Sequence, residues 1–345
     1  MRLSSYRAVS NHLALLSDRQ VAELVAGATP AGSGIGGARA TLEVEGVQVF
    51  VKKVPLTDLD RQPENLRSTA NFYRLPTFYQ YGIGSTGFGV WRELAVHVMT
   101  TNWVLSGAYE GFPLMYHWRV LPDDPQPPLR DDLADTEKAV GYWGGSAAIG
   151  ERLEGLRGAS ACVAIFLEYL PQQLDEWLAI QVASGQVDAA CEMVERELAA
   201  GISFMESRGL LHFDAHFSNI LTDGERIFFT DFGLAISTGF DLSAAEREFF
   251  DDHRTYDWCY AMTHLVRWLI ATFHGVEWGA HQAFLRDCVE GRNLDDVPKS
   301  VAVLIQRYAP IADVMMTFFK KLQSGSRATP YPVQEIAFTL AAGGR

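Results

Sequence analysis

The chain has 345 residues, of which 48% are hydrophobic and 21% charged, a balance typical of globular proteins that excludes collagen, coiled coil and disorder throughout. The length suits two domains of ordinary size or one large domain with two lobes. The formal net charge of −13 disfavours an extended surface for binding phosphates, so no nucleic acid partner is expected.

The cellular compartment can be predicted from the cysteines and the apolar runs. The four cysteines are far apart and include no CxxC pair, which favours reduced thiols over a zinc site or a disulfide framework. No apolar run approaches the roughly 18 residues that a membrane helix needs. The segment 1–20 lacks the sustained apolar core and the cleavage site of a signal peptide. We therefore expect a cytoplasmic protein without a membrane partner.

The segment 1–81 predicts a helical start and then strands. Apolar residues recur at roughly helical spacing over 1–30, and a glycine-rich stretch follows at 32–37. Two runs at 40–44 and 47–54 alternate as strands do, and Glu45-Gly46 between them predicts a hairpin turn. The stretch 55–81 contains three prolines, which predict irregular structure.

The rest of the chain predicts a helix, two further strands and then a helical half. A second glycine-rich run, 82–89, precedes a helix of about 16 residues. A strand at 114–121 leads into prolines that predict an exposed insertion near 123–160, and a buried strand at 162–170 ends at Pro171. Beyond it a short strand pair around 211–231 interrupts a mainly helical pattern, with helices expected at 174–184, 187–208, 243–274, 278–291 and 298–322.

The most informative motif lies in the segment 209–235. It contains HFDAHFSN at 212–219 and, further along, the tripeptide DFG at 231–233. Transfer of a phosphate from ATP needs one carboxylate to orient or deprotonate the acceptor hydroxyl, and an amide and a second carboxylate to hold Mg²⁺. Asp214 is the candidate for the first role, and Asn219 and Asp231 are the candidate metal ligands.

This spacing resembles the protein kinase-like superfamily, which includes eukaryotic-type protein kinases and aminoglycoside-phosphotransferase-like kinases of small molecules. The resemblance implies an α+β, bilobal fold with a small β-rich N-lobe, a larger helical C-lobe, and ATP and Mg²⁺ as cofactors. The implied organisation is an N-terminal extension at 1–19, an N-lobe at 20–167 that carries the insertion, a hinge at 168–171 and a C-lobe at 172–345.

Upstream residues extend the resemblance. Lys52 ends the run VFVK and resembles the lysine of the third strand, which contacts the α- and β-phosphates. Alternation places Lys52 and the adjacent Lys53 on opposite faces of the strand, with Lys52 toward the nucleotide. Gly32, Gly34 and Gly37 fit G-x-G-x-x-G upstream of Lys52, and resemble the hairpin that covers the phosphates.

Three further parts follow in the order of the family. Glu93, in the helix after 82–89, would pair with Lys52, and Glu64 is the second choice. Glu168 and Leu170 resemble the hinge whose backbone binds adenine. Asp257 in Tyr-Asp-Trp resembles the aspartate of a buried helix that anchors the catalytic loop.

Other chemistries remain open for individual motifs. The run 82–89 also matches a dinucleotide fingerprint, although no regular βαβ alternation follows it. His212, Asp214 and His216 alternate, so on a strand they would share a face and could ligate a metal ion in a metallohydrolase. A pseudokinase, a nucleotide-responsive binding module without turnover, is the main alternative to an enzyme.

Departures from the family pattern affect the acceptor. Phe213 replaces the arginine that commonly binds a phosphorylated activation loop, the segment between Asp231 and Asp257 is short, and no A-P-E follows DFG. These features favour a small-molecule acceptor, whereas DFGLA is closer to the protein kinase form. Acidic residues within 241–252 either bind a cationic substrate or form a solvated helix face. The sequence therefore predicts a kinase acting on an unidentified hydroxyl, of protein Ser/Thr or of a small molecule.

Overall fold

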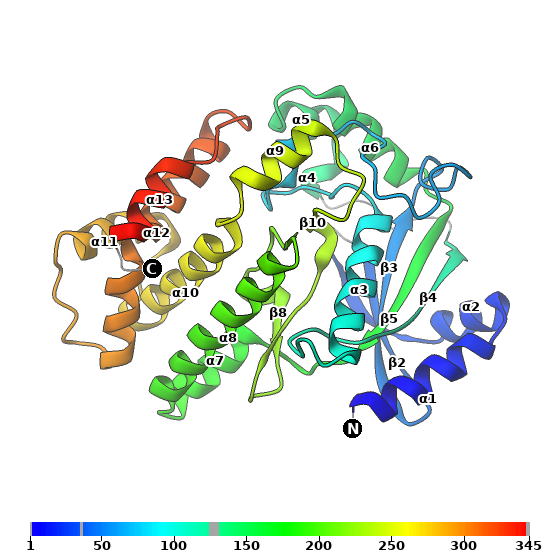
Figure 1. Ribbon diagram of the computed structural model, residues 1–345, viewed down its shortest axis with the longest axis horizontal. Coiled ribbons are helices and arrows are strands. Elements are labelled where there is room, and N and C mark those ends of the chain that lie inside the picture. The colour runs from blue at the N-terminus through cyan, green and yellow to red at the C-terminus, as the bar shows by residue number, and fades with distance from the viewer. Residues whose placement is uncertain (1, 35–36, 124–130, 343–345) are drawn as a thin grey trace. The chain divides into compact units, whose positions relative to one another are not determined.

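A computed structural model describes residues 2–34, 37–123 and 131–342 (Figure 1). The chain forms two compact units, one of Met1–Leu170 with Thr230–Arg247 and the other of Pro171–Phe229 with Glu248–Arg345. The first unit contains the large sheet and the second is mainly helical, so the predicted α+β class is confirmed at this level. The return of Thr230–Arg247 to the first unit differs from the prediction that all of 172–345 forms one lobe.

The first unit is built on a five-stranded antiparallel sheet with the order β1-β2-β3-β5-β4. Its strands are β1 (Thr29–Gly34), β2 (Gly37–Val44), β3 (Val47–Leu56), β4 (Met115–Pro122) and β5 (Ala161–Glu168). The predicted turn at Glu45-Gly46 joins β2 to β3, and both residues have positive φ (52° and 73°), as in two-residue hairpin turns of type I′.

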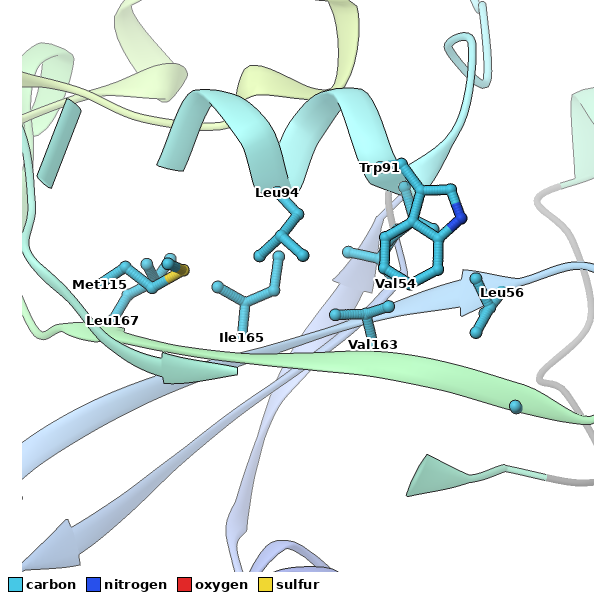
Figure 2. Packing of buried hydrophobic residues seen from close by; sticks show 10 residues of the cluster. Val54, Leu56, Trp91, Leu94, Met115, Val163, Ile165 and Leu167 are labelled. Carbon is cyan, nitrogen blue, oxygen red and sulfur yellow. The ribbon is translucent and has the colours of Figure 1, made fainter. Parts of the chain in front are cut away.

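One face of this sheet packs against helix α3 (Val90–Leu105), which begins where the sequence predicts. The apolar side chains of Trp91 and Leu94 meet β-branched residues of β3 and β5, including Val54 and Ile165 (Figure 2). Burial of each such side chain contributes about 1.5–3 kcal/mol. This packing fixes α3 over the strand that carries Lys52.

The remaining helices of the first unit are its N-terminal pair and a group within the insertion. They are α1 (Arg2–Leu15), α2 (Asp18–Ala26), α4 (Asp131–Ala134), α5 (Thr136–Tyr142) and α6 (Ala147–Arg157), with the short turn η1 (Thr77–Gln80) and, after the segment returns, η3 (Phe232–Leu234) and β10 (Ile236–Ser237). The insertion is more ordered than predicted, because Leu133, Trp143 and Leu153 are buried in a cluster of their own with Tyr79. The prolines at 125, 127 and 128 lie outside the described residues.

The second unit contains a three-stranded sheet, β6-β8-β9, and most of the long helices. Its elements are β6 (Gln172–Gln173), α7 (Leu174–Ala183), α8 (Val187–Ser207), β7 (Leu210–Leu211), η2 (Phe217–Asn219), β8 (Ile220–Thr222), β9 (Ile227–Phe229), α10 (Tyr256–His274), η4 (Trp278–Ala280), α11 (His281–Val289), α12 (Lys299–Ser324) and α13 (Val333–Ala342). The helix predicted at 243–274 is wrong in one respect: it is two helices, α9 (Ala244–Asp252) and α10, separated by a turn. No glycine or proline marks this turn, so it has no signal in the sequence pattern.

One helix in the described part of the chain, α12, is long and apolar enough to cross a membrane by length and composition. It packs against α8, α10 and α11, and 44% of its most apolar window is buried. The core helix of a globular protein can have the same length and composition, so these two properties alone are weak evidence for a membrane span.

Candidate functional site

Lys52 is the centre of a group of charges in the first unit. It lies on β3, its side chain is 4% exposed, and its Nζ donates hydrogen bonds to Oε1 of Glu93 (2.5 Å) and Oδ1 of Asp231 (2.8 Å). Burial by itself lowers the pKa of Lys52, but the charges of Asp231 and Glu93 and their hydrogen bonds outweigh it and raise the pKa above its ordinary value. Lys52 is therefore a fixed cation at all physiological pH values.

The contact predicted between Lys52 and Glu93 is present, although 41 residues separate the two. Glu93 lies in the first turn of α3 and its side chain is 3% exposed. Glu64, the second choice, lies exposed in the loop after β3. Lys53 occupies the other face, as the alternation predicts, and its Nζ lies 2.5 Å from Oδ1 of Asp123.

Asp231 has an unusual backbone conformation. Its φ is 62°, in the left-handed region that non-glycine residues adopt at a cost of order 1–3 kcal/mol. Strain of this kind persists where the surroundings impose it, and it is frequent at functional sites. Arg39 also reaches this carboxylate, with Nη2 3.4 Å from Oδ2.

Arg39 is a residue that the sequence analysis missed, although a signal existed. The turn at Glu45-Gly46 sets the register of β2 on β3, and this register places Arg39 directly opposite Lys52. The position of the Arg39 charge beside Lys52 could therefore have been predicted from the hairpin register.

The predicted glycine-rich hairpin is formed by β1 and β2, whose tip at 35–36 lies outside the described residues. Gly34 pairs with Gly37 across the ladder. A Cβ on Gly37, where φ is 118°, would clash with the carbonyl oxygen of Lys53, whereas a Cβ on Gly32 would meet open space. Only glycine at position 37 allows the hairpin to approach β3 so closely.

The second glycine-rich run, 82–89, has a packing role. Gly87 has φ of 70°, and a Cβ there would clash with the carbonyl oxygen of Gly233, inside the DFG tripeptide. The side chain of Gln80 also donates a hydrogen bond to the carbonyl oxygen of Leu234. These contacts hold the backbone after Asp231 against the start of α3. Throughout the described stretch between β3 and α3 no strand precedes the run, unlike in a dinucleotide fingerprint.

Glu168 and Leu170 are the predicted hinge residues. Glu168 is the last residue of β5, and Leu170 is the last residue of the stretch Met1–Leu170 of the first unit. The backbone N–H of Glu168 donates to the carbonyl oxygen of Leu114 (2.8 Å). Its carboxylate accepts three hydrogen bonds from the guanidinium of Arg2 of α1, at 2.9, 3.2 and 2.7 Å. Nothing in the sequence indicates this contact with α1, and the adenine-binding role stays a prediction.

In the second unit, the structure brings Asp214 and Asn219 together. The side-chain amide of Asn219 donates to Oδ2 of Asp214 at 2.9 Å and to its backbone oxygen at 3.0 Å. The side chain of Asp214 is 20% exposed, so its carboxylate remains accessible to solvent. The predicted metal ligands are thus divided between the units, with Asp231 in the first and Asn219 in the second.

The loop that carries Asp214 is anchored by Asp257 at the start of α10, a contact that the resemblance predicts. The buried carboxylate accepts hydrogen bonds from the backbone N–H groups of His212 (2.6 Å) and Phe213 (2.8 Å). Burial raises the pKa of Asp257 to about 6, although these two hydrogen bonds act in the opposite direction. They also hold Phe213 at φ of 64°, an outlier for a bulky residue, and its ring stacks on Tyr256 with centroids 4.5 Å apart.

The residues His212, Asp214 and His216 do not share a strand face, because β7 ends at Leu211 and Phe213 is left-handed. His212 is buried, with Nδ1 accepting the backbone N–H of Asp214 (3.3 Å), and Nε2 of His216 lies 3.6 Å from Oδ2 of Asp214. Within the described ranges, no group of three His, Cys, Asp or Glu side chains is arranged to hold a metal ion.

Tyr260 is a second residue that the sequence analysis missed. Burial, and then the negative charge of Asp214, raise the pKa of its phenol well above the ordinary value. It lies three residues after Asp257 on α10 and therefore on a neighbouring part of the same helix face, which is the signal that could have identified it.

The sequence matches no family model, and no curated protein matches it.

Proposed function

We propose that this protein is an ATP-dependent kinase of the protein kinase-like fold that transfers the γ-phosphate to a hydroxyl group. The observation that carries the proposal is the buried Lys52 held between Glu93 and Asp231. Glu93 comes from a helix packed on the sheet and Asp231 from the strained backbone of DFG, so three elements far apart in sequence converge on one fixed cation. A pre-positioned cation of this kind stabilises phosphate oxygens at little reorganisation cost.

The donor chemistry of the candidate residues suits the implied cofactor. Carboxylate and amide oxygens are the protein ligands that Mg²⁺ prefers, and Asp231 and Asn219 supply one of each. In this reaction class, Mg²⁺ would neutralise charge developing on the transferred phosphate.

Asp214 would orient the acceptor. In the reaction, the acceptor oxygen bonds to the γ-phosphorus, the bond to the β–γ bridging oxygen breaks, ADP leaves, and the hydroxyl proton passes to Asp214. The amide of Asn219 on Oδ2 and the anchoring of the loop by Asp257 hold this carboxylate in one orientation. Positioning and electrostatic stabilisation carry most of the rate in this reaction class.

The test is Mg²⁺-dependent transfer of γ-labelled phosphate from ATP, offered first to the protein itself and then to small-molecule hydroxyl acceptors, amine-bearing ones included. We expect Asp231→Asn to abolish transfer, and Asp214→Asn to abolish transfer while nucleotide binding is retained. Asp58→Asn, which changes a carboxylate with an 81% exposed side chain, is the matched control and should behave as wild type.

The results of these assays distinguish an active kinase from a pseudokinase. Turnover similar to wild type in either site variant contradicts the assignment. Mg²⁺-dependent nucleotide binding with no transfer to any acceptor identifies the chain as a pseudokinase instead.

A further inference from the structure

Three consecutive residues in the first turn of α3, Trp91, Arg92 and Glu93, each contact a different neighbouring segment. Nε1 of Trp91 donates to the backbone oxygen of Asp60 (2.9 Å), Arg92 pairs with Glu246 (2.7 Å), and Glu93 binds Lys52. Consecutive side chains on a helix point about 100° apart, so these contacts surround the helix axis. Together they determine how α3 is rotated, and rotation decides whether Glu93 reaches Lys52.

The Arg92–Glu246 pair is buried, with both side chains 3% exposed. Nε of Arg92 donates to the backbone oxygen of Thr69 (2.7 Å), and the guanidinium lies over the rings of Phe88 (4.9 Å) and Phe240 (5.5 Å). A buried ion pair contributes little net stability compared with an apolar pair, because desolvation offsets the attraction. Its planar, directional hydrogen bonds nevertheless define one geometry.

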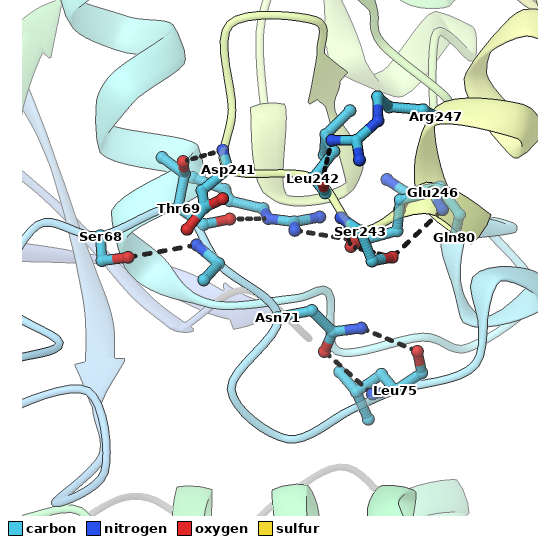
Figure 3. Close-up of polar contacts among 12 residues, drawn as sticks. Ser68, Thr69, Asn71, Leu75, Gln80, Asp241, Leu242, Ser243, Glu246 and Arg247 are labelled. Atoms are coloured by element: carbon cyan, nitrogen blue, oxygen red, sulfur yellow. Dashed lines mark hydrogen bonds and ion pairs between the residues drawn. The ribbon is translucent and has the colours of Figure 1, made fainter.

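Glu246 also organises the segment that follows Asp231. Its Oε2 accepts the backbone N–H (3.0 Å) and the hydroxyl (2.9 Å) of Ser243, and its own N–H donates to that hydroxyl, forming a capping box at the start of α9. The backbone N–H of Asp241 donates to the hydroxyl of Thr69 (2.8 Å). Figure 3 shows Thr69, Asp241, Ser243 and Glu246 lying together at this point.

The segment 231–246 is therefore bound to the first unit at both ends, by Asp231 on Lys52 and by Glu246 on Arg92. The two carboxylate oxygens of Glu246 have different partners: Oε1 binds α3 and Oε2 folds the segment. Ordering of the segment and rotation of α3 are consequently coupled through one side chain.

We propose that Arg92 and Glu246 are positioning residues that hold α3 in the rotation at which Glu93 binds Lys52. This inference rests on the proposed function for its consequence, which is a constitutively assembled phosphate-binding site. Where phosphorylation orders such a segment, it does so by adding a negative charge that an arginine can bind. Here the carboxylate of Glu246 supplies that charge as part of the chain, so assembly of the site requires no modification.

The test measures the accessibility of Lys52, which reports on the position of α3 and does not depend on activity. Acetic anhydride acylates exposed lysines, and mass spectrometry gives the labelling of Lys52 relative to Lys53, whose side chain is 27% exposed and serves as an internal reference. The variant Arg92→Met/Glu246→Gln removes both charges, while glutamine retains the capping box. We expect Lys52 labelling to rise several-fold, toward the value in Glu93→Gln, and kcat for phosphate transfer to fall about tenfold with a smaller change in KM for ATP.

The matched control is Glu151→Gln, an exposed carboxylate on α6 of the same unit, which should leave both readouts unchanged. The variant Arg92→Lys keeps the charge but loses the planar geometry, and should restore part of the Lys52 protection. If the double variant fails to fold, Arg92→Lys decides alone, through an intermediate increase in Lys52 labelling over wild type.

A folded variant with Lys52 as protected as in the wild type would overturn the proposal, because the pair would then be structural only. Absence of phosphate transfer in the wild type would refute the proposed function, while the labelling ratio would still decide the role of Arg92 and Glu246.

Discussion

Lys52 and Lys53 are neighbours on β3 that have opposite surroundings. Lys52 is enclosed between two carboxylates, and Lys53 pairs with Asp123 on the other face of the sheet. The chain therefore contains its own control for any experiment on the lysine, because the two residues share a strand, a charge and a side-chain length.

We expect Lys52→Met to reduce phosphate transfer on the order of 100-fold, a loss typical of removing one preorganised electrostatic group. Loss of the cation also leaves Glu93 and Asp231 facing each other, so the melting temperature should fall. Lys53→Met should leave transfer nearly unchanged. Initial rates and thermal unfolding of both variants provide the measurement, and equal losses of activity in the two would contradict a special role for Lys52.

At Phe213, the sequence predicts that an arginine of the related motif is absent, but it does not predict the packing of the phenylalanine ring. The sequence indicated that the arginine of the related motif is missing. The structure shows what replaces it: the ring stacks on Tyr256 and Phe249 inside the second unit. That stacking depends on residues of α9 and α10, far along the chain, and no local pattern reports it.

At the scale of elements, the contact between the run 82–89 and the DFG backbone can be tested with a pair of glycines. Gly87 and Gly107 share a φ of 70°, but a Cβ would meet Gly233 only at Gly87, and nothing within 4 Å at Gly107. Gly107→Ala should cost about 1–2 kcal/mol from backbone strain alone. Gly87→Ala should cost more and should also weaken Mg²⁺-dependent ATP binding, because it displaces the backbone after Asp231.

Thermal unfolding and nucleotide titration of the two alanine variants make the comparison. Equal effects of the two substitutions on ATP binding would mean that the approach of Gly87 to Gly233 does not position Asp231.

The elements with strong local signals were predictable. The strands β2 and β3, the turn between them and the start of α3 follow from alternation, from glycine and from helical spacing. The pairing of Lys52 with Glu93 followed from the order of the motifs. The Arg92–Glu246 pair joins residues 154 positions apart, and the Arg2–Glu168 pair joins residues 166 apart. Neither pair has a local signature, since charged residues of this kind are usually exposed.

At the scale of the whole molecule, acid should destabilise the fold through buried histidines. Burial lowers the pKa of His253 to about 4 and that of His264 to about 3, whereas an unfolded histidine titrates near 6.5. Between about pH 6.5 and 4 the unfolded chain therefore binds more protons at these two sites, and the stability that they contribute is lost as the pH falls.

Asp257 acts in the opposite sense. Its folded pKa of about 6 lies above the ordinary value of 3.8, so over that interval the folded state holds the extra proton. Taken together, these two histidines and Asp257 give a net slope of about one proton, or roughly 1.4 kcal/mol per pH unit. His117 and His281, whose pKa values burial also lowers, add to the loss. Urea unfolding at pH 7 and pH 5 should show this loss of stability, and His253→Phe should reduce it. An unchanged slope in His253→Phe would contradict the assignment.

The return of residues 230–247 to the first unit has a consequence for how the chain acquires its structure during translation. Lys52 can bind Asp231 only after a further 179 residues have been synthesised, and Arg92 can bind Glu246 only after a further 154. At about 5–20 residues per second, a ribosome needs roughly 10–40 s to synthesise the intervening chain. During that interval the sheet can form and Lys52 can pair with Glu93, but Asp231 and Glu246 are not yet present. The first unit therefore completes its folding only after the first stretch of the second unit, Pro171–Phe229, has been synthesised. Contacts of such high sequence separation make folding slow.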